Sequence, residues 1–412
     1  MVQAGTTVSV DDDIGTLREA LVQGPVCNPH RQVQPVGRAN SQEAMRQHAR
    51  LVSELEAAGV AIQHLDRLVY SALGFADARD WLLERRVGER ECDGRPADEM
   101  IAWLSEQPAD ILTHYVMEGM PRSALPSGFA CLGHDNPDGA GWFLPPLGNF
   151  THPRGLVRFL DGGAVVCQPE PAASRAAAIT ISAVLNFAPL FDHSGFDIWL
   201  DVYGTETSCP PINGRDITVP GHMTCVGAIT HATSVQALSL LAASLFRQGK
   251  AETMFWIDLT GAGCESLDDC FVPLSDECLL VDMKVLEMAN AFVVRANTRG
   301  AVLGIEPCKS GFLTELSVAL GSTEPCYIDV SRFAGPVGSA LASVAPIVLS
   351  PARIMAFEHH EAAFPLLEQH GVEIASVLPG SALSQQGKGP RGLLTALRVE
   401  RPVPLKANSK ES

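Results

Sequence analysis

The chain has 412 residues, of which 46% are hydrophobic and 19% charged, the balance of a folded protein rather than a disordered one. Thirty basic residues against 47 acidic ones give a net charge of −17, and such a surface repels nucleic acid and anionic membranes. There is no apolar run of the roughly 18 residues that a membrane helix needs, no signal-peptide pattern at the start and no disulfide framework in the eleven scattered cysteines, so we expect a cytoplasmic protein.

A local pattern recurs five times along the chain: a segment with helical spacing of apolar residues ends near a glycine, and an extended run follows. Glycine is expected just past a helix because it lacks the Cβ that makes a positive φ unfavourable. The five glycines are Gly59, Gly195, Gly249, Gly321 and Gly371. This alternation predicts an α/β fold made of five strand–helix units.

The first two units are separated by an insertion. Gly59 and Gly195 lie 136 residues apart, whereas the later spacings are 54, 72 and 50 residues. Helix-forming residues with apolar positions every three or four residues fill much of the gap. We therefore expect a first unit at 1–71, a helical insertion at 72–122, the remaining units at 123–402 and a polar tail at 403–412.

Several short segments, in order, are similar to those of a known enzyme family. They are DDDIGTLREALVQGP, WLLERRV, AWLSEQPADILTHYVMEGM, LPPLGNFTHP, INGRDITV, ESLDDCFV and GKGPRGLLTALRVERP. Over nearly the whole chain they resemble the arginine deiminase family, a branch of the guanidino-modifying pentein enzymes. The resemblance implies a five-bladed pentein-type α/β propeller with a helical insertion and a ligand site in its central pore.

The family reaction hydrolyses arginine to citrulline and ammonia, and it needs four kinds of group. A cysteine thiolate attacks the guanidinium carbon, a histidine moves protons, and two carboxylates hold the guanidinium. The resemblance places the cysteine, histidine, aspartate and glutamate of the family on Gly392, Ser266, Pro153 and Asn213. It therefore implies no catalytic residue of the family type, and we expect neither a cofactor nor a metal.

Polar residues in the matching segments are the candidates for the lining of the pore. They are Asn149, His152, Asn213, Asp216, Ser266, Asp268, Lys388 and Arg391. Asp216 and Asp268 are the acidic residues that two of the motifs retain. Two interpretations stay open for them: structural acceptors of backbone N–H groups, or the negative wall of a pocket that accepts a cation or amine.

Three other motifs have a simpler interpretation than a functional one. The G-x-G-x-x-G at 387–392 follows a polar loop and precedes an extended run, which favours a flexible pore-lining loop, able to hold an anion, over a dinucleotide site. The histidines of Glu358–Glu361 would point about 100° apart on a helix, which favours surface residues over metal ligands. Cys264 and Cys270 flank Ser266, and small buried thiols are favoured over a relocated nucleophile.

Two functions follow from these observations. We expect a deiminase homologue that does not hydrolyse arginine and that binds a small polar molecule or regulates a partner, within a homo- or hetero-oligomer or alone. The alternative is an active enzyme whose rebuilt pore acts on another small polar substrate by non-thiol chemistry. Ordinary deiminase activity is the least favoured function.

Overall fold

Five sheets repeat one arrangement of strands in this computed structural model. It describes residues 8–25, 38–87, 97–129, 141–147, 150–169, 171–192, 195–201, 210–221, 223–297, 303–333, 344–384 and 389–401. In each sheet the first strand is antiparallel to the second, and the third is parallel to the second. A helix joins the second strand to the third, because neighbouring parallel strands need a crossover connection.

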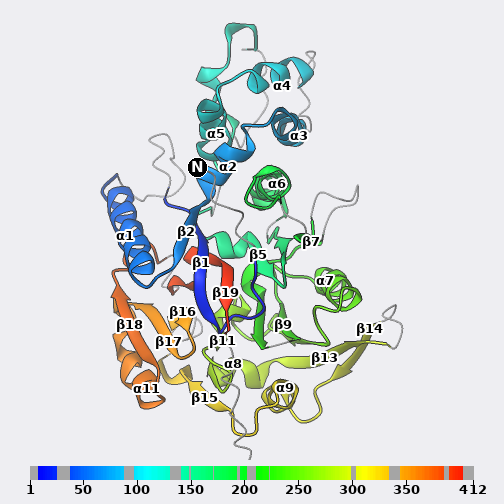
Figure 1. Cartoon of the computed structure of the whole chain (residues 1–412), viewed down its shortest axis with the longest axis vertical. Coiled ribbons are helices and arrows are strands. Elements are labelled where there is room, and N and C mark those ends of the chain that lie inside the picture. The colour runs from blue at the N-terminus through cyan, green and yellow to red at the C-terminus, as the bar shows by residue number, and fades with distance from the viewer. Residues whose placement is uncertain are drawn as a thin grey trace, which may run out of the picture.

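The units use segments from the whole chain, and the last strand completes the first unit (Figure 1). The first unit consists of β19 (Leu394–Glu400), β1 (Thr16–Val22), α1 (Arg38–Ala57) and β2 (Ala61–His64). The second consists of β5 (Val157–Leu160), β6 (Gly163–Val166), α6 (Pro171–Phe187) and β7 (Asp197–Leu200). The third consists of β8 (Ile217–Gly221), β9 (Thr224–Ile229), α7 (Val235–Arg247) and β10 (Thr253–Asp258).

The last two units follow the same order, with one excursion. The fourth consists of β11 (Phe271–Pro273), β12 (Cys278–Val281), α9 (Phe312–Leu320) and β15 (Cys326–Asp329). Between β12 and α9 the chain forms α8 (Met283–Met288), β13 (Asn290–Ala296) and β14 (Leu303–Pro307), and these strands extend the third sheet. The fifth consists of β16 (Ile347–Ser350), β17 (Arg353–Phe357), α11 (Phe364–Gln369) and β18 (Glu373–Leu378).

The α/β fold of five strand–helix units is thus confirmed. The five sheets lie around a common centre in Figure 1, an arrangement compatible with a propeller. All five glycines that the sequence pattern singled out have a positive φ, from 64° at Gly249 to 96° at Gly195. At these positions a side chain would strain the backbone. Gly59, Gly249, Gly321 and Gly371 follow the end of a helix within two residues, whereas Gly195 lies eight residues beyond the end of α6.

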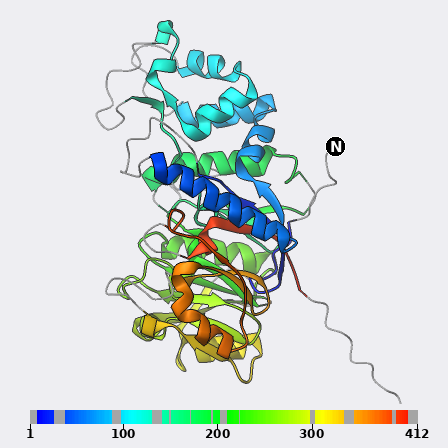
Figure 2. The same ribbon diagram turned by 90° about the vertical axis from the view of Figure 1, so that its left-hand side faces the viewer.

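Helices between the first and second units form a lobe at one end of the long axis (Figures 1 and 2). They are α2 (Leu65–Ala72), α3 (Ala76–Val87), α4 (Ala97–Ser105) and α5 (Ala109–Glu118), followed by the short pair β3 (Met120–Pro121) and β4 (Trp142–Leu144). The buried Arg86 of α3 donates hydrogen bonds to the carbonyl oxygen of Val116 and to the hydroxyl of Thr180 on α6. This side chain therefore fastens the lobe to the second unit.

Single 3-10 turns lead into the first strand of four units. They are η3 (Pro153–Gly155) before β5, η4 (Gly214–Asp216) before β8, η5 (Leu267–Asp269) before β11 and η9 (Pro390–Leu393) before β19. In the contacts between elements, η3 touches both η4 and η9, and η4 touches η5. The charged side chains of four separate units therefore meet at the centre of the fold.

Gly214 lets two of these turns approach closely. A Cβ atom at this position would overlap the carbonyl oxygen of Arg154 in η3. We expect Gly214→Ala to lower the free energy of unfolding by roughly 2–3 kcal/mol, because η3 and η4 would have to separate. In urea unfolding, Gly261→Ala is the matched control, since a Cβ there meets no atom within 4 Å. A loss for Gly214→Ala no larger than for the control would contradict this account of the packing.

Candidate functional site

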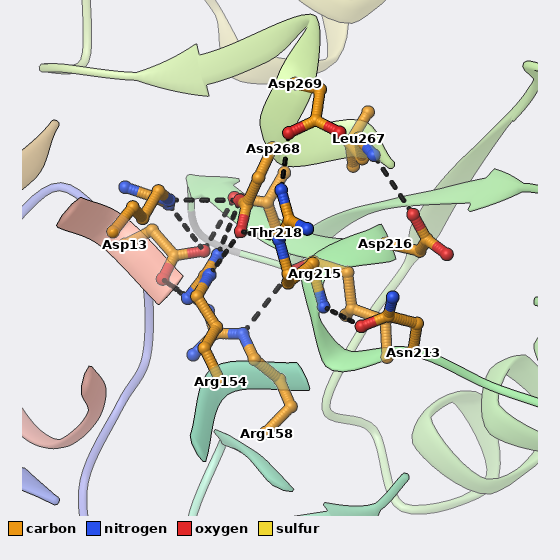
Figure 3. A network of polar contacts seen from close by, with 12 residues as sticks. Asp13, Arg154, Arg158, Asn213, Arg215, Asp216, Thr218, Leu267, Asp268 and Asp269 are labelled. Atoms are coloured by element: carbon orange, nitrogen blue, oxygen red, sulfur yellow. Dashed lines mark hydrogen bonds and ion pairs between the residues drawn. The ribbon is translucent and has the colours of Figure 1, made fainter. Parts of the chain in front are cut away.

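A buried network of arginine and aspartate side chains occupies the centre of the fold (Figure 3). Its members come from the segment before β1 and from η3, β5, η4, η5 and η9: Asp13, Arg154, Arg158, Arg215, Asp268, Asp269 and Arg391. Their side chains are between 0% and 15% exposed. Charges this deeply buried are stable only when they are paired and hydrogen-bonded.

Asp268 is the main acceptor of the network. Arg154 donates to it through two nitrogens, with distances of 2.7 Å from Nε to Oδ2 and 3.0 Å from Nη2 to Oδ1. Arg391 donates a third hydrogen bond, 3.0 Å from its Nε to Oδ1. The two-point contact with Arg154 is the geometry in which a guanidinium binds a carboxylate most strongly. Asp268 therefore already holds two cations of its own chain.

Asp13 is the second acceptor and joins the first unit to the network. It forms an ion pair with Arg158 and accepts hydrogen bonds from the Thr218 hydroxyl at 2.6 Å and the Val219 N–H at 2.9 Å. Burial alone would raise the pKa of Asp13, but the guanidinium groups of Arg158, Arg154 and Arg391 outweigh it and lower that pKa. Asp13 is therefore ionised in the folded protein.

Asp268 is ionised for the same reason. Burial would raise its pKa, yet Arg154, Arg391 and Arg215 together lower it. Arg391 is less well satisfied, since its Nη2 has no hydrogen-bond acceptor among the described residues and lies 3.9 Å from Oδ2 of Asp13. Burial and the neighbouring Arg154 lower the pKa of Arg391 to about 10, which still leaves it charged near pH 7.

Asp216 belongs to a separate acceptor site next to the network. It accepts hydrogen bonds from the hydroxyls of Thr230 and Thr233 and, at 3.0 Å, from the Leu267 N–H of η5. Burial raises the pKa of Asp216 to about 7, although these donors and Arg215 act in the opposite direction. The contacts agree with a structural role, because they tie η4 to η5.

This raised pKa predicts a pH dependence of stability. Between pH 3.8 and about 7 the folded state binds a proton at Asp216 that the unfolded state lacks, so the contribution of this group falls as the pH rises. On going from pH 5 to pH 7.5, we expect the free energy of unfolding of Asp216→Asn to rise, relative to that of the wild type, by on the order of 1–3 kcal/mol. Urea unfolding of both proteins at the two pH values measures this double difference.

Comparison with the wild type is essential here, because burial lowers the pKa of His48 to about 4 and that of His360 to about 3. Both histidines make stability rise with pH below 6.5, opposite to Asp216. Their effect is common to both proteins and cancels in the difference. Parallel pH profiles for the wild type and Asp216→Asn would mean that Asp216 is ionised throughout.

Little space remains beside the network. The cavity bounded by Asp13, Arg154, Arg391 and apolar side chains of β1, β16 and β19 has a volume of about 30 Å³. One water molecule occupies about that volume in the liquid, whereas pockets for small molecules measure roughly 300–1,000 Å³. In the described part of the chain, this cavity is too small for an amino acid.

The structure brings most of the predicted pore residues to this centre. Asn213 caps η4 by accepting a hydrogen bond from the Arg215 N–H at 3.0 Å. Ser266 is fully buried, and its hydroxyl has no hydrogen-bond partner among the described residues. His152 lies beside Gly392, where a Cβ would meet its ring carbon at 3.3 Å. Asn149 and Lys388 lie outside the described residues.

Arg391 differs from the expectation of a flexible loop. It lies within η9, its side chain is 7% exposed, and it is held by Asp268. The cause is a carboxylate from a distant unit, which sequence spacing does not reveal. Another difference concerns Glu358–Glu361, which form part of the 3-10 helix η7 (Glu358–Ala363). His360 in this helix is buried, whereas a surface position was expected.

The Cys270 thiol, close to Ser266 in the sequence, is unsuited to nucleophilic attack. Burial raises the pKa of Cys270 well above its ordinary value, so the thiol stays protonated near pH 7 and is a poor nucleophile. The Sγ of Cys264 donates to the carbonyl oxygen of Ser266 at 3.0 Å. Cys270 is thus the small buried thiol that was expected, whereas Cys264 is only partly buried.

Most members of the network were not predicted from the sequence. Arg154, Arg215 and Asp269 each stand directly beside a residue that it singled out, namely Pro153, Asp216 and Asp268. Their position next to motif residues was the signal that could have identified these charged residues as members of the site. Asp13 belongs to a run of three aspartates, a pattern typical of an exposed segment, and nothing in its local sequence indicates a buried ion pair.

The described residues lack two further kinds of feature. None of their helices is long and apolar enough to cross a bilayer. Within the same ranges, no three His, Cys, Asp or Glu side chains are placed to hold a metal ion.

Comparisons with known proteins agree with the fold. Residues 38–397 match the family described as Arginine deiminase. An arginine deiminase from Bacillus cereus (strain ATCC 10987 / NRS 248) is 22% identical over 363 residues, which cover 84% of this chain and 85% of that protein.

Two solved structures are similar at lower identity. SxtG, an amidinotransferase from Microseira wollei in the saxitoxin biosynthetic pathway, superposes with a TM-score of 0.53 at 12% identity, over 96% of this chain and 98% of that one. A variant of AgrE in complex with L-arginine gives a TM-score of 0.51 at 9% identity, over 93% of this chain and 41% of that one.

Proposed function

Because the chain belongs to the arginine deiminase family, we propose that it is a member that does not hydrolyse arginine and that serves as a small-molecule-binding or regulatory protein. The pairing of Asp268 with Arg154 and Arg391 carries the proposal. A carboxylate that holds two guanidinium groups of its own chain is not available to an external one. An incoming cation would have to displace a buried, two-point ion pair.

The composition of the site supports the same proposal. The resemblance to the family implies a nucleophile, a proton carrier and two carboxylates at four positions. These positions are occupied by Gly392, Ser266, Pro153 and Asn213, respectively. A cavity of about 30 Å³ also argues against the alternative of a rebuilt pore that acts on another small polar substrate. That alternative would need the arginines to leave the centre before a substrate could enter.

Mass spectrometry of arginine incubated with concentrated protein tests the proposal. We expect no citrulline above the level of a protein-free control, because no thiolate of the family type is present and the central carboxylate is occupied. A panel of guanidino, ureido and amino-acid analogues extends the test to the alternative function. Turnover that follows the elution peak of the pure protein would overturn the proposal.

Gly392→Cys makes the test sharper. The new thiol would lie near His152, so it would restore a nucleophile beside a histidine without freeing Asp268. We expect this variant to stay inactive on arginine. Citrulline formation by Gly392→Cys would mean that Arg154 and Arg391 yield to substrate, which contradicts a closed site.

A further inference from the structure

Two cysteines face each other across the fourth sheet. Cys278 is the first residue of β12 and Cys326 is the first residue of β15, and the two are register partners in neighbouring parallel strands. Their sulfur atoms lie 3.6 Å apart, in direct contact. This sheet lies toward the end of the molecule opposite the helical lobe (Figure 1). Both cysteines are free thiols in this structure, so the contact joins two reduced side chains.

Both thiols point to the same face of the sheet. Successive side chains along a strand alternate between the two faces, so Cys278 shares its face with Leu280, and Cys326 shares its face with Ile328. All four side chains pack in one hydrophobic cluster between the fourth and fifth units. The two thiols therefore converge, as a cross-link between them requires.

The backbone already has the spacing that a disulfide needs. Adjacent strands lie about 4.7–4.9 Å apart, within the range of about 4.4–6.8 Å that separates the Cα atoms of a disulfide. The Cys326 N–H donates to the carbonyl oxygen of Glu277 at 2.6 Å, and the Cys278 N–H donates to the hydroxyl of Ser275 at 3.1 Å. Because both strand starts are held, rotation of the side chains would bring the sulfur atoms to a bonding distance of about 2.0 Å.

The two thiols differ in their access to solvent. Cys326 is partly buried, whereas Cys278 is only 7% exposed. Burial and the adjacent Cys326 thiol raise the pKa of Cys278 to about 12, so its reactive thiolate form is scarce near neutral pH. An oxidant in solution therefore meets Cys326 first, and Cys278 is placed to react second.

We infer that Cys278 and Cys326 form a reversible disulfide when the protein meets hydrogen peroxide. The Cys326 sulfur attacks one peroxide oxygen and the O–O bond breaks. The leaving hydroxide takes the Cys326 proton, which gives a sulfenic acid and one water. The Cys278 sulfur then attacks the Cys326 sulfur, an S–S bond replaces the S–O bond, and the released hydroxide takes the Cys278 proton to form a second water. Two electrons thus pass from the two thiols to the peroxide.

The cross-link would close a long segment of the chain. The two cysteines are 48 residues apart, and the segment between them contains α8, β13, β14 and α9. Because β13 and β14 extend the third sheet, the disulfide would fix both ends of the excursion that joins the third and fourth units. The inference goes beyond the proposed function, since neither cysteine belongs to the central network.

Peptide mapping after peroxide treatment of the full chain tests the inference. With one equivalent of hydrogen peroxide at pH 7.5, we expect the intact mass to fall by two hydrogen atoms and two fewer thiols to be alkylated after denaturation. Trypsin should then release residues 251–284 linked to residues 310–332. Cys326 is the only cysteine in the second peptide, so the link identifies it. Dithiothreitol should separate the peptides and restore both thiols.

Two approaches identify the other half of the link. Fragmentation of the linked peptide in the mass spectrometer locates the bond within residues 251–284 without any variant. Cys278→Ser and Cys326→Ser should each abolish the linked peptide, whereas Cys308→Ser should leave its yield unchanged. Cys308 is the matched control, because it lies in the same excursion and is partly buried like Cys326.

Two results would overturn the inference. One is a linked peptide that persists in Cys278→Ser, because the bond would then join Cys326 to a different cysteine. The other is oxidation of Cys326 to sulfinic acid with no linked peptide, which would mean that Cys278 does not reach it. Neither readout involves arginine, so failure here is distinguishable from failure of the proposed function.

Discussion

Asp268→Asn should destabilise the protein by about 3–5 kcal/mol, because it removes the charge that holds Arg154 and Arg391 in the interior. The substitution preserves shape, so the loss reports the uncompensated positive charge rather than a cavity. Arg215, with its Nε 4.0 Å from Oδ2 of Asp268, adds to the repulsion. Urea unfolding followed by circular dichroism measures the free energy of unfolding.

An exposed ion pair of the same chemistry gives the control. Arg18 and Glu400 form a contact of 2.8 Å, but their side chains are 44% and 46% exposed, and such pairs contribute at most about 1 kcal/mol. We therefore expect Glu400→Gln to change stability far less than Asp268→Asn. Equal losses for the two variants would mean that the central network is as well solvated as the surface.

The fold was largely predictable from local signals. Five positions require a positive φ, and the sequence shows this because each of them is a glycine: Gly59, Gly195, Gly249, Gly321 and Gly371. The five-unit α/β fold follows from these turns and from the alternation of periods. The closing strand β19 was harder to place, because its pairing with β1 joins opposite ends of the chain.

The turns that meet at the centre carry motif residues, whereas the pairing of their charged side chains could not be predicted. The turns η3, η4, η5 and η9 contact one another, and His152, Asn213, Asp268 and Arg391 lie on or beside them. What fills the centre depends on side chains that pair over long separations, such as Arg154 with Asp268, 114 residues apart. Such pairing has no local signature, so the sequence left two interpretations open for Asp216 and Asp268, structural acceptors or the negative wall of a pocket.

Truncation of the central arginine tests whether the network stands in the place of a ligand. Arg154→Ala should lower the free energy of unfolding by about 3–5 kcal/mol, because Asp268 loses its two-point partner and a cavity opens beside it. The vacated space matches the length of an alkylguanidinium, and the Asp268 carboxylate in it would attract a positive charge. Added ethylguanidinium should therefore bind there and restore part of the lost free energy of unfolding.

The expected restoration is about 1.4 kcal/mol at a concentration ten times the Kd, seen as a rise in Tm of the variant. Arg353→Ala is the matched control, since Arg353 pairs with Glu373 at the surface and its removal leaves no buried cavity. Ethylammonium should restore less, because one ammonium cannot reproduce two parallel hydrogen bonds.

Rescue confined to Arg154→Ala would indicate that Asp268 still recognises a guanidinium and that the protein's own arginine occupies the position of a ligand. The proposed lack of arginine hydrolysis would then have two causes, the occupied centre and the glycine at position 392, since a restored nucleophile would face a filled site. An equal rise in Tm for the wild type, Arg353→Ala and Arg154→Ala would mean that ethylguanidinium acts as a general salt. The closed centre would then have to be explained by packing alone.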